Sequence, residues 1–89
     1  FGALTKAMSN DWAAYGICVN AIAPGYMNTQ LNTALITDEK RSGEVLLRTP
    51  AGRWGAPADM KGVTVFLASS ASDFITGAII PVDGGYSAR

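Results

Sequence analysis

Histidine is absent from this 89-residue sequence, and cysteine occurs only once, at Cys18. Without an imidazole the chain cannot form a Ser-His-Asp triad, and with a single thiol it cannot supply the nitrogen and sulfur ligands of a zinc site. Cys18 cannot form an internal disulfide, and because it lies in an apolar run we expect a buried free thiol. The sequence therefore predicts no metal site and no histidine-based catalysis.

Long apolar runs and an excess of one charge are also missing. Apolar runs such as 17–19 and 63–68 are far shorter than the ~20 residues of a membrane-spanning helix, and no signal-peptide pattern opens the chain. Seven Lys plus Arg residues balance seven Asp plus Glu residues, and no basic stripe is present. Neither nucleic acid nor a membrane is therefore an expected partner, and we predict a cytoplasmic protein.

The composition is that of a globular protein, with 48% hydrophobic and 16% charged residues. A chain this short nevertheless buries only about 60% of the surface that its unfolded state exposes. Leu4, Met8 and Trp12 recur every four residues and predict an amphipathic first helix. It is in phase from Phe1, has no N-cap, and ends at Gly16. We therefore expect the chain to be cut from a longer protein.

Two apolar segments predict strands. The first, 17–23, is apolar on both alternating faces, which is typical of a strand covered on both sides in a parallel sheet. The second, 78–82, contains Pro81, which donates no ladder hydrogen bond and favours a sheet edge. Between them Pro57 occupies the first position of a predicted helix. A helix between two parallel strands forms a right-handed crossover.

The connection between the first strand and this helix is long. Residues 26–50 show weak periodicity apart from a charged stretch, 38–47, that predicts a short helix. A structureless connection of this length is uncommon in a compact domain, so we expect a mobile excursion with one or two short helices. The predicted order is helix, strand, excursion, helix, strand, which is an α/β arrangement.

Three stretches in this order resemble one known family. They are 20–29 (NAIAPGYMNT), 52–59 (GRWGAPAD) and 82–85 (VDGG). At these separations they are similar to signatures of the C-terminal part of short-chain dehydrogenases/reductases, and the resemblance covers essentially the whole chain. It implies that 1–89 is the C-terminal portion of a Rossmann-type, doubly wound parallel sheet and is incomplete as a domain. The stretches 49–55 and 83–89 further resemble the sugar-acid dehydrogenases of this family.

The resemblance also identifies what the chain does not contain. Family members carry a glycine-rich phosphate loop, a residue that selects NAD or NADP, and a catalytic Ser with a Tyr-x-x-x-Lys pair, and nothing here matches these patterns. Lys6 lacks the required tyrosine, because Gly2 stands four positions before it. The resemblance places the Tyr and the Lys just upstream of Phe1. We therefore assign no catalytic residue to this chain and predict that it is inactive alone.

The loop after the first strand is the segment for which we predict a ligand contact. Ligands of open α/β sheets lie beyond the carboxyl ends of the strands, where Pro24 turns the chain and Gly25 permits close backbone approach. The resemblance implies that the backbone around Met27 and the hydroxyl of Thr29 hold the nicotinamide carboxamide of NAD or NADP, with NAD slightly favoured. A plain turn, in which Thr29 caps the next short helix, is the alternative.

Residues 26–50 resemble the substrate lid of the family, with Tyr26, Leu31 and Arg48 as candidate substrate contacts. Closure of such a lid would exclude water and position the substrate. An acidic substrate needs a cation, which Arg41 or Arg48 could provide. Charges on such a stretch are also typical of a helix face that is exposed to solvent. We prefer this second interpretation, in which the arginines contact no substrate.

Arg53 and Trp54 precede the second predicted helix. We expect Arg53 to pair with a carboxylate, either Asp59 or one outside the chain, rather than to contact substrate. Trp54 is expected to be a packing residue. The resemblance places the turn at 83–85 and the tail that follows near a subunit interface.

Two functions follow from these features. In the first, the chain is part of an oxidoreductase that transfers a hydride between a secondary alcohol of a sugar or sugar acid and a nicotinamide cofactor. Its partners would be the rest of the enzyme upstream of Phe1, a small-molecule substrate, and further subunits in a homodimer or homotetramer. In the second, it is a non-catalytic, shortened paralogue that serves as an interaction module. A folded small oligomer without cofactor binding would favour the second.

Overall fold

The computed structural model describes residues 2–88, and the chain divides into two compact units. Unit 1 comprises Phe1–Ala23 with Lys61–Ile80, and unit 2 comprises Pro24–Met60 with Pro81–Arg89. Each strand of the sheet has residues in both units.

Strands β1 (Ala21–Pro24) and β2 (Ile79–Val82) form a two-stranded sheet. The Ala21 N–H donates to Ala78 O at 2.9 Å, and the Gly25 N–H donates to Val82 O at 3.0 Å. Because the paired positions increase together along both segments, the strands are parallel. The predicted parallel pairing is confirmed.

Strand β1 begins at Ala21, later than the predicted start at residue 17. Before Ala21, side-chain hydrogen bonds replace most of the backbone hydrogen bonds between the two segments. Thr76 Oγ1 accepts the Val19 N–H at 3.0 Å. The Asn20 side chain accepts the Ala78 N–H and donates to Ile75 O, both at 3.0 Å. Val19 and Asn20 are therefore held beside the segment that precedes β2 mainly by side-chain hydrogen bonds, with one backbone bond from the Gly77 N–H to Val19 O at 2.7 Å.

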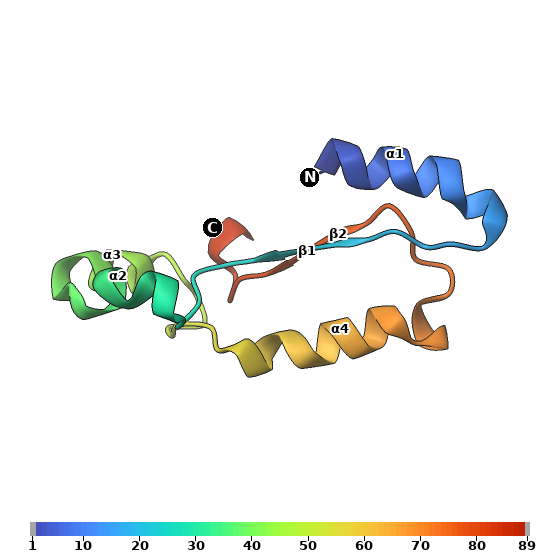
Figure 1. Cartoon of the computed structure of the whole chain (residues 1–89). Coiled ribbons are helices and arrows are strands. Elements are labelled where there is room, and N and C mark those ends of the chain that lie inside the picture. Colours follow the sequence, from blue (N-terminus) through green and yellow to red (C-terminus); the bar gives the residue numbers. More distant parts are fainter. Residues whose placement is uncertain (1, 89) are drawn as a thin grey trace. The chain divides into compact units, whose positions relative to one another are not determined.

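Unit 1 has one helix on each face of the strand pair. Helix α1 spans Gly2–Trp12 and continues as a 3-10 turn, Ala13–Tyr15, whereas α4 spans Lys61–Ala68 and precedes a 3-10 turn at Ser70–Ser72. Figure 1 shows α1 and α4 on opposite sides of the strands, as a doubly wound α/β sheet requires. The α1 segment ends as predicted at Gly16, whose φ of 75° is left-handed.

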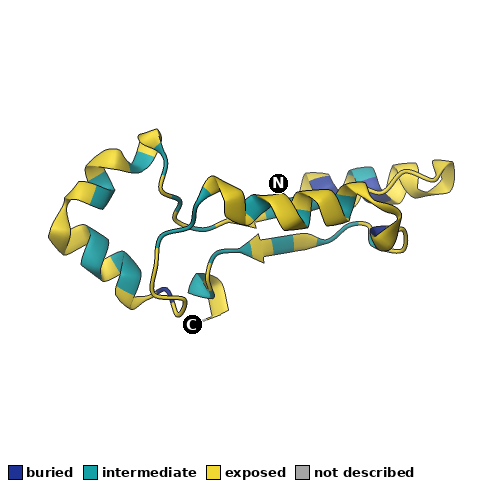
Figure 2. Cartoon of the chain, turned by 90° about the horizontal axis from the view of Figure 1, so that it is seen from below, coloured by how far each residue is buried: buried dark blue, intermediate teal, exposed yellow. Residues whose placement is uncertain are grey.

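Apolar burial is slight throughout residues 2–88. No hydrophobic residue within 2–88 is buried, and the buried residues are all polar: Thr5, Ser9, Thr49 and Ser72 (Figure 2). On the predicted apolar face of α1, Leu4 and Trp12 are 58% and 41% exposed, whereas Ser9 faces inward with its Oγ 2.8 Å from Thr76 Oγ1. The prediction that Cys18 is buried is wrong, since the thiol is exposed. Two strands with one helix on each face cannot surround large apolar side chains.

Unit 2 contains the short helices predicted within 26–50. They are a 3-10 turn at Gln30–Asn32, α2 at Thr33–Thr37 and α3 at Glu39–Leu47, and further 3-10 turns occur at Pro57–Met60 and Tyr86–Ala88. Helix α3 begins where Asp38 Oδ1 accepts the Arg41 N–H at 3.2 Å, a typical N-cap bond. Within the described part of the chain, no helix is long and apolar enough to cross a membrane.

Candidate functional site

Gly25, in the loop that follows β1, lies against the turn that follows β2. A Cβ at Gly25 would lie 2.6 Å from Asp83 Cβ and 2.7 Å from Asp83 Cα. No side chain fits at this separation, so glycine is required by the approach of Asp83. The close approach predicted at Gly25 is therefore one between two segments of the protein backbone.

The segment after Gly25 pairs with a second loop of unit 2. Met27 forms an isolated parallel bridge with Gly55: the Gly55 N–H donates to Tyr26 O at 3.0 Å, and the Asn28 N–H donates to Gly55 O at 2.7 Å. In such a bridge the N–H and C=O of the central residue face away from the partner. The backbone groups of Met27 are thus turned away from Gly55.

Met27 O is fully used, because it accepts the Thr29 N–H at 3.0 Å and Asn32 Nδ2 at 2.8 Å. Thr29 is extended (φ −130°, ψ 168°) and precedes the 3-10 turn Gln30–Asn32, but its side chain makes no capping bond, so the capping interpretation is wrong. Within residues 2–88, neither the Thr29 hydroxyl nor the Met27 N–H has a hydrogen-bond partner. One hydroxyl and one N–H donor match the C=O and NH₂ of a carboxamide. These residues fit the nicotinamide group.

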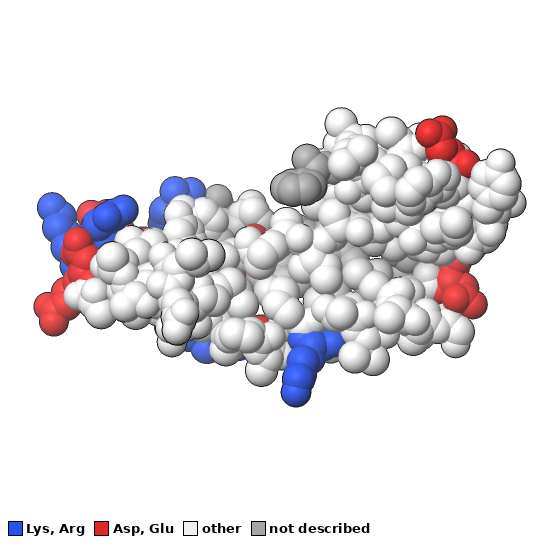
Figure 3. Space-filling model, viewed as in Figure 1, with Lys and Arg blue, Asp and Glu red and all other residues white. Residues whose placement is uncertain are grey.

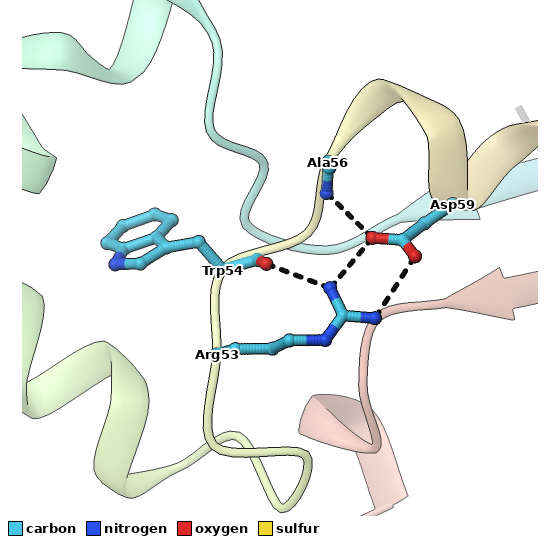
Figure 4. A network of polar contacts seen from close by, with 4 residues as sticks. All are labelled: Arg53, Trp54, Ala56 and Asp59. Carbon is cyan, nitrogen blue, oxygen red and sulfur yellow. Dashed lines mark hydrogen bonds and ion pairs between the residues drawn. The ribbon is translucent and has the colours of Figure 1, made fainter.

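Arg53 forms a bidentate ion pair with Asp59, as predicted (Figure 4). Arg53 Nη1 donates to Asp59 Oδ2 at 2.8 Å and to Trp54 O at 3.1 Å, and Nη2 donates to Asp59 Oδ1 at 3.0 Å. The Ala56 N–H adds a 2.7 Å bond to Asp59 Oδ2. Hydrogen bonds from Arg53 and then from Ala56 lower the pKa of Asp59 to about 2. Arg53 thus holds the loop before α4 and is already paired with a carboxylate.

A cavity of about 190 Å³ lies in unit 2 beside this ion pair. Its lining residues are Tyr26, Met27, Thr49, Ala51, Arg53, Gly55, Asp59, Val82, Asp83 and Gly84. Asp83 is held by its own turn, accepting Ser87 Oγ at 2.6 Å and the Gly85 N–H at 3.0 Å. The Ser87 hydrogen bond is the main cause of a lowered pKa at Asp83. Asp83 is therefore a turn residue, as its sequence context indicates.

A second cavity of unit 2, of about 250 Å³, is named here the arginine cavity. Its lining residues are Tyr26, Leu35, Arg41, Glu44, Val45, Arg48 and Tyr86. The Arg48 guanidinium carbon lies 4.7 Å from the centroid of the Tyr86 ring, a cation–π distance. The Tyr26 ring lies 5.4 Å from Tyr86 and 5.9 Å from Trp54, edge to face in both cases. The rings of Tyr26 and Tyr86 thus form one wall of the cavity beside Arg48, and Trp54 packs against Tyr26.

Helix α3 is tied to this wall by Trp54, whose Nε1 donates to Ser42 Oγ at 3.0 Å. Trp54 is thus a packing residue with one polar link, which agrees with its predicted role. Charged side chains of both signs gather over α3, at the left of Figure 3. The arginine cavity therefore lies in a mixed-charge region.

The structure brings together some of the predicted site residues and separates others. Tyr26 lines both cavities, Met27 lines the first and Arg48 the second. Leu31 lines neither and is 96% exposed. Sequence reasoning missed Tyr86. The available signal was that Tyr26 and Tyr86 follow the carboxyl ends of neighbouring parallel strands, which meet at one edge of a sheet.

Known proteins resemble this chain over nearly its whole length. A protein-family model described as enoyl-(acyl carrier protein) reductase matches residues 1–87. The chain is 58% identical to the 2-dehydro-3-deoxy-D-gluconate 5-dehydrogenase of Escherichia coli strain K12, and the match covers 97% of this chain and 34% of the relative. The chain thus spans about a third of the length of such relatives. The predicted likeness to sugar-acid dehydrogenases is confirmed.

Two solved structures show the same fold over 99% of this chain. A protein of Agrobacterium tumefaciens, provisionally named a 2-deoxy-D-gluconate 3-dehydrogenase and solved with NADP, is 53% identical with a TM-score of 0.96, and 36% of it is covered. A gluconate 5-dehydrogenase of Burkholderia cenocepacia, solved with NADP and tartrate, is 50% identical with a TM-score of 0.95, and 34% of it is covered. The predicted preference for NAD receives no support from these two structures.

Proposed function

Because this chain belongs to the short-chain dehydrogenase/reductase family, we propose that it is part of an oxidoreductase acting on a secondary alcohol of a sugar acid with NAD or NADP. The observation that carries the proposal is the loop after β1, where the Thr29 hydroxyl and the Met27 N–H are unused by the residues that the structure describes. The sugar-acid dehydrogenases that it resembles support the substrate class.

In this proposal the loop after β1 orients the cofactor. Gly25 lets the loop lie directly against Asp83, and the bridge to Gly55 fixes the segment that contains Met27. The Met27 N–H and the Thr29 hydroxyl then hold the two polar groups of the carboxamide and so select one ring face. The bound nicotinamide would supply the hydride acceptor in one direction and the donor in the other.

The residues that move the proton lie outside 2–88 in this proposal. A tyrosine of the family pattern would take the hydroxyl proton, and a lysine would lower the pKa of that tyrosine. The chain alone is then inactive. Helices α2 and α3 would act as the substrate lid, and the exposed apolar side chains of α1 and α4 would pack against the rest of the domain or a second subunit.

The proposal is tested in the full-length enzyme by measuring NADP- and NAD-dependent oxidation of D-gluconate and of 2-dehydro-3-deoxy-D-gluconate. Replacing Thr29 by Val removes one hydrogen bond to the carboxamide, so we expect the KM for the cofactor to rise about five- to tenfold. Thr37→Val is the matched control, because the Thr37 hydroxyl bonds only to carbonyls of α2. Absence of turnover in the wild type, or an unchanged cofactor KM in Thr29→Val, would contradict the proposal.

A further inference from the structure

Arg41 of α3 and Arg48, which follows the end of this helix, line the arginine cavity without a carboxylate partner among residues 2–88. Both arginines line the cavity, and their seven-residue separation corresponds to about 10 Å along the axis of α3. The ion pair recorded in the described chain joins two other residues, Arg53 and Asp59. The cavity therefore presents two unpaired cations on one wall.

Arg48 is the better positioned of the two. Its guanidinium lies 4.7 Å from the centre of the Tyr86 ring, and Tyr86 is itself in edge-to-face contact with Tyr26. No acceptor in the part of the chain that the structure describes takes an N–H group of the Arg48 guanidinium. A guanidinium held beside a ring with its donors free can bind a carboxylate through two parallel hydrogen bonds.

Arg53 provides the internal contrast. Its guanidinium is occupied by the bidentate bond to Asp59 and by Trp54 O. Arg48 has the same chemistry and lacks such an acceptor. The difference indicates that Arg53 serves the loop, whereas the fork of Arg48 is available to a molecule from outside.

The rest of the cavity suits a small polar acid. Its volume of about 250 Å³ is near the lower end of ligand pockets, which start at roughly 300 Å³. Tyr26 and Tyr86 bring hydroxyl groups to the lining, and Leu35 and Val45 bring a small apolar area. Glu44 lies between the two arginines on α3 and offsets one of the two positive charges. The lining retains a net positive charge.

We infer that the arginine cavity binds the carboxylate of the sugar-acid substrate, with Arg48 as the specificity-determining cation and Tyr86 as the residue that positions it. This inference rests on the proposed function and specifies how that function recognises an acid. Arg41 contributes a second, more distant positive charge. Glu44 lowers the positive charge of the cavity, although it forms no ion pair with either arginine within the described residues.

The test measures the Kd of the full-length enzyme for D-gluconate and for D-gluconamide by calorimetry. The two probes share a carbon skeleton and differ in the charge of the recognised group. In Arg48→Gln we expect the Kd for gluconate to rise about 10- to 100-fold, while the Kd for gluconamide stays within about twofold. Lys40→Gln is the matched control, because it removes the same charge from α3 outside the cavity lining.

Further variants separate position from charge. Arg48→Lys keeps the charge but loses the fork, so its Kd for gluconate should fall between those of the wild type and Arg48→Gln. Tyr86→Leu should raise the Kd about two- to fivefold, and Tyr86→Phe, which keeps the ring, should not. Glu44→Gln should lower it a few-fold, because a negative charge that would repel the carboxylate of gluconate is removed from the cavity lining.

The outcomes distinguish this inference from the proposed function. Equal weakening of both probes in Arg48→Gln, or an unchanged Kd for gluconate, would overturn the arginine assignment even if the enzyme still transfers hydride. A selective loss of gluconate binding in an enzyme without hydride transfer would support the acid site and overturn the proposed reaction. If Arg48→Gln does not fold, Arg48→Lys and Tyr86→Leu decide the question through the same two Kd values.

Discussion

Polar side chains serve different ends in the two units. In unit 1, Asn20 and Thr76 are engaged with nearby backbone, and together they align the start of β1. In unit 2, Arg53 is likewise satisfied, whereas the Thr29 hydroxyl and the Arg48 guanidinium have no hydrogen-bond partner within the described residues. Satisfied polar groups define the fold, and groups of the same chemistry left open are available to ligands. Residue type alone does not separate the two classes.

The largest expected effect tests whether Gly25 is structural, as its contact with Asp83 indicates. In the full-length enzyme, Gly25→Ala would place a Cβ 2.6 Å from Asp83 Cβ, which forces the two segments apart. We expect the free energy of unfolding to fall by about 1–3 kcal/mol, as in other overpacked sites. The displaced loop should also bind NADP more weakly. Chemical denaturation and a cofactor titration measure the two effects.

Gly43→Ala is the control for this variant. Nothing lies within 4 Å of a Cβ at Gly43, and the residue lies inside α3. Alanine should therefore stabilise the helix by up to about 1 kcal/mol. If Gly25→Ala were as stable as Gly43→Ala, the requirement for glycine at the turn would be disproved, and a ligand would become the better reason for it.

Asn20 of unit 1 tests whether a polar side chain whose hydrogen bonds are all made within the protein contributes to stability and not to ligand binding. Asn20→Ala removes the bonds to Ile75 O and to the Ala78 N–H, so the free energy of unfolding of the full-length enzyme should fall by about 1–2 kcal/mol. Affinities for NADP and gluconate should stay unchanged once folding is complete. Asn10→Ala, on the exposed side of α1, should be neutral by the same denaturation assay. Weaker ligand binding without lost stability would move Asn20 to the ligand-binding class.

Much of the architecture could be predicted from sequence because it depends on local signals. The four-residue spacing from Leu4 to Trp12, the helix stop at Gly16 and the apolar segments gave the order of the elements. The inward side of α1 could not be predicted, because Ser9 is buried by a bond to Thr76, which is 67 positions away. Hydrophobic spacing reports the apolar side of a helix and carries no information on such a pair.

The candidate site was predictable to the extent that it depends on single loops. Arg53 was predicted to pair with a carboxylate, either Asp59 or one outside the chain, and the structure shows the pair with Asp59, six residues away. The contact between Arg48 and Tyr86 was not predicted, because it joins the end of α3 to a turn near the C-terminus. Leu31 was a candidate lid contact because its segment resembles the substrate lid of the family, and its side chain is almost fully exposed. Both the contact of Arg48 and the exposure of Leu31 depend on where segments distant in the sequence lie in the fold.

The smallest expected effect concerns the pH dependence of the Arg53–Asp59 pair. The pKa of Asp59 is lowered to about 2 in the folded chain, below the value of about 3.9 for an unfolded chain. A carboxyl group with a depressed folded pKa contributes stability above its unfolded pKa. That contribution is lost as the pH falls from about 4 to about 2. Because the pair is exposed and screened by solvent, the effect should be small.

Asp59→Asn isolates this contribution, because the amide cannot ionise and keeps nearly the same shape. The melting temperature of the full-length wild type should exceed that of Asp59→Asn near neutral pH, and the two should converge as the pH approaches about 2. Asp11→Asn, which removes an exposed carboxylate of α1, should not show this convergence. The affinity for gluconate should be unaffected in Asp59→Asn, because Arg53 does not line the arginine cavity. If gluconate bound more tightly to this variant, a freed Arg53 would be competing with Arg48 for the acid, and the division between the two arginines would fail.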